Sequence, residues 1–336
     1  MTALIPTPSS HGKRTLVIQI PCLNEAATLK IALDALPRKV EGFDEVKVLI
    51  IDDGSTDGTS ELARSLGVDR IVRHPVNRGL AAAFMTGLEA ALRMGADVIV
   101  NTDADNQYSA ADIPLLTSPI LAQRADMVIG ARPIDDTEHF SYIKKKLQRI
   151  GSWAVRVASQ TDVLDAPSGF RAISREAAMR MNVFGNYTYT LETIIQAGLS
   201  GLIIASVPIN TNEDLRPSRL VKSIWSYVVR SLGTIARVLM IYRPLMVFSL
   251  LGAFPFAVGL AAGLRFVWFY LRGEGGGHVQ SVVLSGLCLT LAAIMLTIGL
   301  ISDLVAANRK LSERLLRHVR HLEDQIEAQR PERQPD

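Results

Sequence analysis

The stretch VIVNTDADNQYSAADIP, residues 98–114, decides the fold and the chemistry expected of this chain. Residues 98–100 form an apolar run that is typical of a buried strand. The run ends in Asp103 and Asp105, one residue apart, with Gln107 two residues further on. Two carboxylates this close repel each other unless a cation lies between them, and Mg²⁺ or Mn²⁺ takes such oxygen ligands together with substrate phosphates. A single D-x-D pair also occurs by chance in surface turns, so it needs support from the rest of the chain.

The surrounding pattern alternates between strands and helices. Apolar runs predict strands over residues 15–20, 46–55, 70–74, 97–103 and 126–132, and helical spacing predicts helices over 25–36, 58–67 and 80–95. Such alternation indicates βαβ units and an α/β domain with a mostly parallel sheet. Ligands of these sheets bind beyond the carboxyl ends of the strands. We therefore expect three polar segments to share one edge and one site: Pro21–Glu25, with a turn at Pro21, Asp52–Asp57 and Asp103–Gln107.

Composition narrows the class of protein only slightly. The chain has 336 residues and a formal net charge of +3, which is too small to indicate a nucleic-acid partner. Cys22 and Cys288 are expected to be free thiols, because no Cys/His cluster has the spacing of metal ligands. The mean hydropathy of +0.21 is high, and the apolar residues accumulate after Pro244.

Two long apolar segments follow Pro244. Residues 244–264 and 279–302 carry no charge, and each is close to the ~20 residues that cross a hydrocarbon core. The short link between them predicts an antiparallel hairpin, with aromatic residues 268–270 at one interface. Lys and Arg are dense on both flanks of the hairpin and sparse in its turn, which puts the sheet domain and both chain ends in the cytoplasm. The alternative is a pair of helices buried inside a soluble protein.

The remaining segments are predicted from their charge and spacing. Residues 1–14 read as a flexible polar leader, and residues 215–243 as basic amphipathic helices at the membrane interface. Leucines at near-heptad spacing in residues 304–336 predict a cytoplasmic helix, either a short coiled coil or a helix on lipid, followed by a disordered tail. The expected organisation adds a catalytic domain over 15–214 and two transmembrane helices over 244–303. The oligomeric state stays open, with a homo-oligomer among the alternatives.

An ordered set of motifs supports the acidic pair. The chain reads IPCLNE at 20–25, IIDDGSTDGT at 50–59, HPVNRGLAAA at 74–83, IGAR at 129–132 and DAPSGFRAIS at 165–174. From residue 15 to residue 222 this set resembles the family 2 glycosyltransferases, and within them the dolichol-phosphate mannose synthase and polyprenol-phosphate glucosyltransferase group. The resemblance implies a GT-A catalytic domain, with a Rossmann-like mostly parallel sheet, joined to a C-terminal two-helix transmembrane hairpin.

The resemblance also implies roles for individual residues. A nucleotide-sugar donor would be bound by these positions: Pro21, Leu23, Glu25, Asp53, Arg78, Gly79, Asp103, Ala104, Arg216 and Lys222. Mg²⁺ or Mn²⁺ would be held by Asp103, Asp105 and Gln107. The catalytic set would be Asp105 together with Arg132, Lys145 and Arg149, and the three cations would hold the acceptor phosphate.

The acceptor can be argued from its chemistry. The second pKa of a lipid monophosphate is near ~6, so at neutral pH it is largely a dianion and needs no general base. It needs cations that position it beside a negatively charged donor. Arg132, Lys144–Lys146 and Arg149 supply such cations, although Lys144 and Lys146 equally fit a solvated face or anionic lipid head groups.

The expected function is therefore a membrane-anchored, metal-dependent, inverting glycosyltransferase. It would transfer a sugar from GDP-mannose or a UDP-hexose to polyprenyl phosphate, as a multi-pass protein of the inner (plasma) membrane. The turn after the D-x-D reads NQYS rather than QHPP, and the later basic loop reads NEDLRPSRL, so neither sugar nor lipid is specified. One alternative is a hydroxyl acceptor on a glycan or glycolipid, with Asp165 or Glu192 as the base. Another is a non-catalytic scaffold that only binds nucleotide sugars.

Overall fold

The computed structural model describes residues 13–133, 161–181, 189–212 and 242–328, with some isolated positions between these ranges. The described residues fall into two compact units. One lies within residues 1–235 and 320–336, and the other within residues 236–319.

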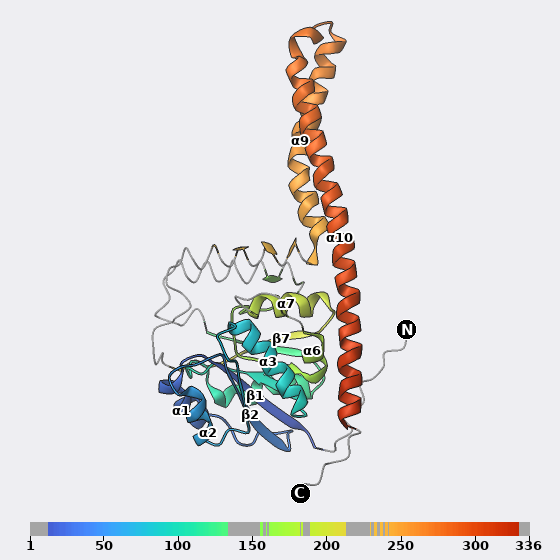
Figure 1. Ribbon diagram of the computed structural model, residues 1–336. Helices are drawn as coiled ribbons and strands as arrows, with labels where there is room; N and C mark the ends of the chain where they lie inside the picture. The colour runs from blue at the N-terminus through green and yellow to red at the C-terminus, as the bar shows by residue number, and fades with distance from the viewer. Residues whose placement is uncertain are drawn as a thin grey trace. The chain divides into compact units, whose positions relative to one another are not determined.

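The first unit is built on a seven-stranded sheet in the order β3-β2-β1-β4-β6-β5-β7 (Figure 1). Along the chain these strands are β1 (Thr15–Cys22), β2 (Glu45–Asp52), β3 (Arg70–Arg73), β4 (Val98–Asn101), β5 (Met127–Ala131), β6 (Arg171–Ser174) and β7 (Ile204–Pro208). All neighbours pair in parallel except β6, which runs antiparallel to both β4 and β5. The predicted α/β fold with a mostly parallel sheet is confirmed, while β6 and β7 are additions that the pattern analysis did not predict.

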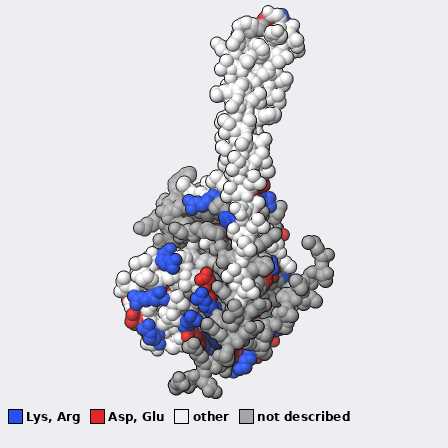
Figure 2. All heavy atoms as spheres, turned by 45° about the vertical axis from the view of Figure 1, so that its right-hand side comes forward, with Lys and Arg blue, Asp and Glu red and all other residues white. Residues whose placement is uncertain are grey.

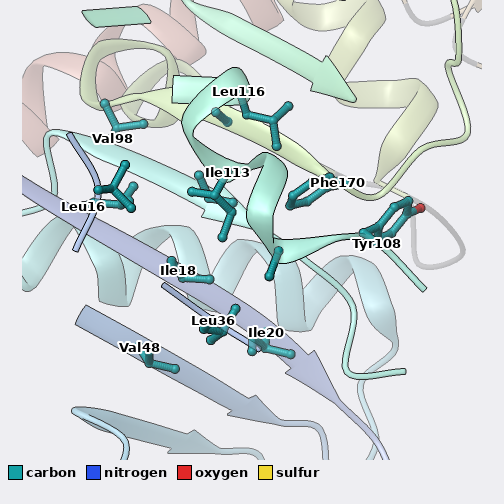
Figure 3. Close-up of a cluster of buried hydrophobic side chains, with 14 of the residues drawn as sticks. Leu16, Ile18, Ile20, Leu36, Val48, Val98, Tyr108, Ile113, Leu116 and Phe170 are labelled. Carbon is teal, nitrogen blue, oxygen red and sulfur yellow. The ribbon is translucent and has the colours of Figure 1, made fainter. Parts of the chain in front are cut away.

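Helices cover both faces of the sheet, so its central strands are apolar on both sides. The helices are α1 (Ala26–Asp34), α2 (Thr59–Ser65), α3 (Leu80–Arg93), α4 (Ile113–Leu121), which follows the short helix η1 (Ala110–Asp112), α6 (Arg175–Arg180) and α7 (Thr190–Leu199). On one face, Leu16, Ile18 and Ile20 of β1 share a buried cluster with side chains of α1, α2 and α4 (Figure 3). On the other face, Gln19 of β1 lies against Gly87 of α3.

The predicted turn at Pro21 is wrong, because β1 continues through Cys22. Pro21 is in register with Ile51 of β2, and Cys22 with Asp52. The carbonyl of Gln19 accepts from Thr102 on the β4 side, and that of Cys22 accepts from Asp53 on the β2 side. The backbone nitrogen of Pro21 therefore points toward the β4 side of β1. Because β4 pairs with β1 only as far as Gln19, no strand there requires a hydrogen bond from residue 21, and proline is tolerated.

The second unit is a hairpin of two long apolar helices. Helix α9 (Pro244–Leu271) is followed by the short helix η2 (Gly275–His278) and by α10 (Val279–Ala328). Small residues let the two backbones come close, and Ser285 Oγ donates to the carbonyl of Gly259 across the interface at 2.8 Å. The predicted pair of apolar C-terminal helices is confirmed.

The surface of the hairpin fits hydrocarbon better than a protein interior. Both helices are long and apolar enough to cross a membrane. In their most apolar 18-residue stretches, only 11% and 17% of the residues are buried. Leu250 and Phe254 are 74% and 77% exposed. In Figure 2 the visible face of the paired helices α9 and α10 is free of Lys, Arg, Asp and Glu between its ends. This exposure argues against the alternative of a hairpin buried in a soluble protein.

Helix α10 does not stop at the end of the apolar segment. It continues without interruption to Ala328, with Leu311, Leu315 and Leu322 exposed along it. The predicted helix after residue 303 is thus a continuation of the second apolar helix. The leader up to residue 12 and most of the predicted amphipathic segment 215–243 lie outside the described residues.

Candidate active site

The segments expected to form a site extend from one edge of the sheet. Register pairs Cys22 with Asp52 and Gln19 with Asn101, so β1, β2 and β4 end at the same edge of the sheet and the segments that follow them extend from that edge. Strand β5 is parallel to these strands, which puts Arg132 at the same edge. Strand β6 runs antiparallel, so its first residue, Arg171, lies at this edge.

The acidic turn after β4 is braced by the segment after β7. The backbone N–H of Gln107 donates to Asp105 Oδ1 at 3.2 Å, and Asn106 has a positive φ of 57°. Asn212 donates from its backbone to the carbonyl of Gln107 at 2.8 Å, and from its side chain to the carbonyl of Asn106 at 2.8 Å. Ala104 is 4% exposed, so it anchors the turn between the two acids.

Asp103 and Asp105 carry an electrostatic cost that a cation would relieve. Burial, and then the charge of Asp105, raise the pKa of Asp103 to about 7, and Arg132 and Arg171 only partly oppose that rise in pKa. Among the described residues no group of three His, Cys, Asp or Glu side chains is placed to hold a metal. Two carboxylates on one turn fit a divalent ion such as Mg²⁺, which proteins often bind through one or two carboxylates together with substrate phosphates.

We expect Asp103→Asn to stabilise the metal-free protein at pH 8. The pKa of Asp103 is about 7 in the folded chain and roughly 4 in an unfolded one, so the wild type loses stability as pH rises between these values. Partial solvent exposure reduces the full linkage energy to about 1–2 kcal/mol, or roughly 2–5 °C in melting temperature. Melting curves in detergent with EDTA should show this gain at pH 8, and little of it at pH 5. An equal gain at both values would contradict the raised pKa.

The loops after β1 and β2 are joined by hydrogen bonds. The backbone N–H of Asn24 donates to Ser55 Oγ at 2.9 Å, that of Glu25 to Thr59 Oγ1 at 3.0 Å, and that of Ala26 to Asp57 Oδ2 at 3.0 Å. These bonds hold the segment that carries the predicted donor-binding residues: Pro21, Leu23 and Glu25. Pro21 and Glu25 are buried, and Thr28 Oγ1 donates to Glu25 Oε2 at 3.0 Å.

Asp53 holds the loop that follows β3. Its carboxylate accepts from the backbone N–H groups of Arg78 at 2.9 Å and Gly79 at 2.8 Å, and it lies 2.7 Å from His74 Nδ1. The predicted donor-binding residues Arg78 and Gly79 are therefore positioned by Asp53. The predicted contact of Asp53 with the base stays a prediction.

Asp52, next to Asp53, is fully buried and structural. Burial alone would raise its pKa, but hydrogen bonds from Ser55 and Ser60 outweigh burial and hold the pKa of Asp52 below its ordinary value.

Arg132 is paired with a buried acid. Its Nε donates to Asp165 Oδ2 at 2.7 Å and its Nη2 to Asp165 Oδ1 at 3.1 Å. The side chain of Asp165 is 0% exposed and that of Arg132 is 16% exposed. Asp165 thus fixes one edge of the guanidinium. The other predicted phosphate-binding and donor-binding cations lie outside the described residues: Lys145, Arg149, Arg216 and Lys222.

A buried polar network lies behind the acidic turn, and sequence reasoning missed most of it. Asn101 Nδ2 donates to the carbonyl of Gly169 and to Tyr189 Oη, both at 2.9 Å. The N–H of Gly169 donates to Tyr108 Oη at 3.0 Å, and Figure 3 shows Tyr108 at the edge of the apolar cluster beside Phe170. Two signals were present in the sequence: Asn101, a polar residue inside an apolar strand, and the motif at 165–174 that contains Gly169.

Comparison with known proteins identifies the family. Residues 17–182 match the family described as Glycosyl transferase family 2. The polyprenol monophosphomannose synthase of Mycolicibacterium smegmatis is 30% identical over 62% of this chain and 81% of its own length. The chain belongs to glycosyl transferase family 2.

Two further comparisons place this family 2 glycosyltransferase. The UDP-N-acetylglucosamine–dolichyl-phosphate N-acetylglucosaminyltransferase of Methanococcus voltae is 28% identical over 59% of this chain and 86% of its own length. Glucosyl-3-phosphoglycerate synthase of Mycobacterium tuberculosis, solved with Mn²⁺, UDP-glucose and phosphoglyceric acid, has a TM-score of 0.53 at 24% identity, over 67% of this chain and 80% of that one. The structural likeness supports the GT-A fold of the family 2 domain.

Proposed function

We propose that this family 2 glycosyltransferase transfers a sugar from a nucleotide sugar, GDP-mannose or a UDP-hexose, to polyprenyl phosphate. The observation that carries the proposal is the closeness of opposite charges at one sheet edge. Arg132 is near enough to Asp103 to oppose the rise in the pKa of that carboxyl. A donor diphosphate bound through the acids and an acceptor phosphate bound by arginine would then be neighbours. The relatives named for polyprenol and dolichyl phosphate support this acceptor.

The reaction is an in-line displacement. An oxygen of the lipid phosphate forms a bond to the anomeric carbon while the bond from that carbon to the nucleotide diphosphate breaks, so the configuration inverts. Mg²⁺ or Mn²⁺, when bound, would neutralise the charge of the departing diphosphate. Asp103, Asp105 and Gln107 would hold that ion. Arg132 would orient the acceptor phosphate and offset its repulsion from the donor.

The geometry supports a phosphate acceptor better than a hydroxyl acceptor. A hydroxyl requires a base within reach of its proton. Asp165 is fully buried, and both of its oxygens accept hydrogen bonds from Arg132. Glu192 is 4% exposed, in the first turn of α7. A phosphate dianion needs neither of them.

Transfer by the purified full-length chain tests the proposal. Radiolabelled GDP-mannose, UDP-glucose and UDP-N-acetylglucosamine would each be incubated with Mn²⁺ and undecaprenyl phosphate in detergent. Label is expected in the organic phase with one of these donors, and only when both metal and lipid phosphate are present. Transfer to undecaprenol or to a glycan, with none to the phosphate, would favour the hydroxyl acceptor.

We also propose that the hairpin of α9 and α10 crosses the inner membrane and that both chain ends lie in the cytoplasm. In a background without Cys22 and Cys288, a membrane-impermeant maleimide should label Gly276→Cys in intact cells and Ser312→Cys only after lysis. Gly276 lies in η2 between the helices, and Ser312 is an exposed residue of α10 beyond the apolar segment. The opposite labelling pattern would contradict the orientation.

A further inference from the structure

Arg171 is a fully buried arginine beside the candidate active site. It is 0% exposed, and no carboxylate of the described residues lies within 4.0 Å of it. Its Nη1 donates to Thr193 Oγ1 at 2.7 Å and to the carbonyl of Thr190 at 3.3 Å, and its Nη2 donates to the carbonyl of Ser168. Its Nε has no hydrogen-bond partner within the described part of the chain.

Burying an arginine side chain costs free energy that an apolar side chain would not cost. Removing a charge from water costs several kcal/mol, and an apolar side chain of similar volume in its place is often neutral or stabilising. The cation–π interaction with the ring of Tyr189, whose centroid is 5.2 Å from the guanidinium carbon, offsets only part of that desolvation cost. Stability alone therefore accounts poorly for an arginine at this position.

The bond from Arg171 to Ser168 acts on the neighbouring Gly169. The backbone of Gly169 is held on both sides, by Tyr108 Oη at its N–H and by Asn101 Nδ2 at its carbonyl. A methyl group built on Gly169 would lie 3.1 Å and 3.2 Å from the two oxygens of Asp103. The Asp103 carboxylate thus packs against the backbone of Gly169, which forms a wall beside it.

We propose that Arg171 is a positioning residue for Asp103. By fixing Ser168 and the start of α7, it holds the Gly169 wall in place, and this wall orients the Asp103 carboxylate toward the donor and its divalent ion. The inference rests on the proposed function for the role of Asp103.

Mn²⁺ binding to the full-length chain in detergent, measured by electron paramagnetic resonance with UDP or GDP present, tests the inference without requiring turnover. Arg171→Met should weaken the Mn²⁺ affinity about tenfold. Its melting temperature should stay within a few degrees of that of the wild type, because the variant removes a buried charge that has no carboxylate partner among the described residues. Arg171→Lys should recover part of the affinity. The matched control is Arg175→Met at the far end of β6, where Arg175 donates to the carbonyl of Ala96 at 2.9 Å, and it should bind as the wild type does.

Gly169→Ala tests directly whether the Gly169 wall orients the Asp103 carboxylate. It provides the decisive measurement if Arg171→Met fails to fold. Its methyl group should displace the Asp103 carboxylate and weaken Mn²⁺ binding roughly 3- to 10-fold. Gly286→Ala in α10, where an added methyl meets no atom within 4 Å, should bind normally. Undiminished binding in a folded Arg171→Met, or in Gly169→Ala, would overturn the role of Arg171 and leave the proposed function standing. A wild type that binds no Mn²⁺ would overturn both.

Discussion

Asp105→Asn is expected to lower sugar transfer by about 10³-fold or more while leaving the fold intact. Asparagine keeps the shape of the side chain and the oxygen that accepts from the N–H of Gln107 at 3.2 Å, so the turn should survive. What it removes is the negative charge that would hold the divalent ion and, through it, the departing diphosphate. Because that charge acts on the leaving group, the loss should appear in kcat as well as in the metal requirement.

The measurement is radiolabelled sugar transferred to undecaprenyl phosphate over a range of Mn²⁺ concentrations, with melting curves to verify folding. Asp97→Asn is the matched control, since Asp97 precedes the same strand at the opposite edge of the sheet, where it accepts from the N–H of Thr15 at 2.8 Å. We expect its activity within about twofold of the wild type. A folded Asp105→Asn with wild-type turnover would remove the metal role from Asp105.

Arg132→Met is expected to reduce kcat/KM for the lipid phosphate about 10²-fold and to leave the KM for the donor nearly unchanged. Charge-assisted hydrogen bonds to a phosphate contribute roughly 1.5–3 kcal/mol, which corresponds to about one to two factors of ten. The variant should also lose stability by about 3–5 kcal/mol, because the buried Asp165 carboxylate would lose both hydrogen bonds from the guanidinium.

A double variant separates these two effects. Arg132→Met combined with Asp165→Asn also removes the buried negative charge, and the asparagine oxygen can still accept from the backbone N–H of residue 132, which lies 3.3 Å from Asp165 Oδ2. Stability should largely return while transfer stays low. Activity that recovers together with stability would mean that Arg132 serves only as the partner of Asp165, and the acceptor site would have to be sought elsewhere.

The polar ends of β1, β2 and β4 were predictable because a parallel sheet brings its carboxyl ends to one edge. Asp53, Asp103 and Asp105 each come within a few residues of the end of an apolar run, so local sequence was enough to predict that they extend from the same sheet edge. The same was true of the two apolar helices after Pro244, where length and lack of charge suffice.

The antiparallel strand β6 was not predictable from a four-residue run that starts with arginine. Only the pairing of β6 between β4 and β5 brings Ser168, Gly169 and Arg171 beside Asp103. The pairing of Arg132 with Asp165 likewise joins positions 33 residues apart. Such contacts depend on how the chain closes over the sheet, and spacing along the sequence carries no record of that closure.

The amino-acid sequence by itself determined the alternating α/β pattern, the acidic sheet edge and the apolar hairpin, because each follows from residues that are adjacent or one helical turn apart. The tertiary structure alone decided which groups restrain the acids and Arg132. Asp53 holds the backbone of Arg78 and Gly79, Asp165 holds Arg132, and the wall beside Asp103 comes from Gly169. The physical reason is that buried polar groups must find partners wherever the folded chain brings a complementary group, near or distant in sequence.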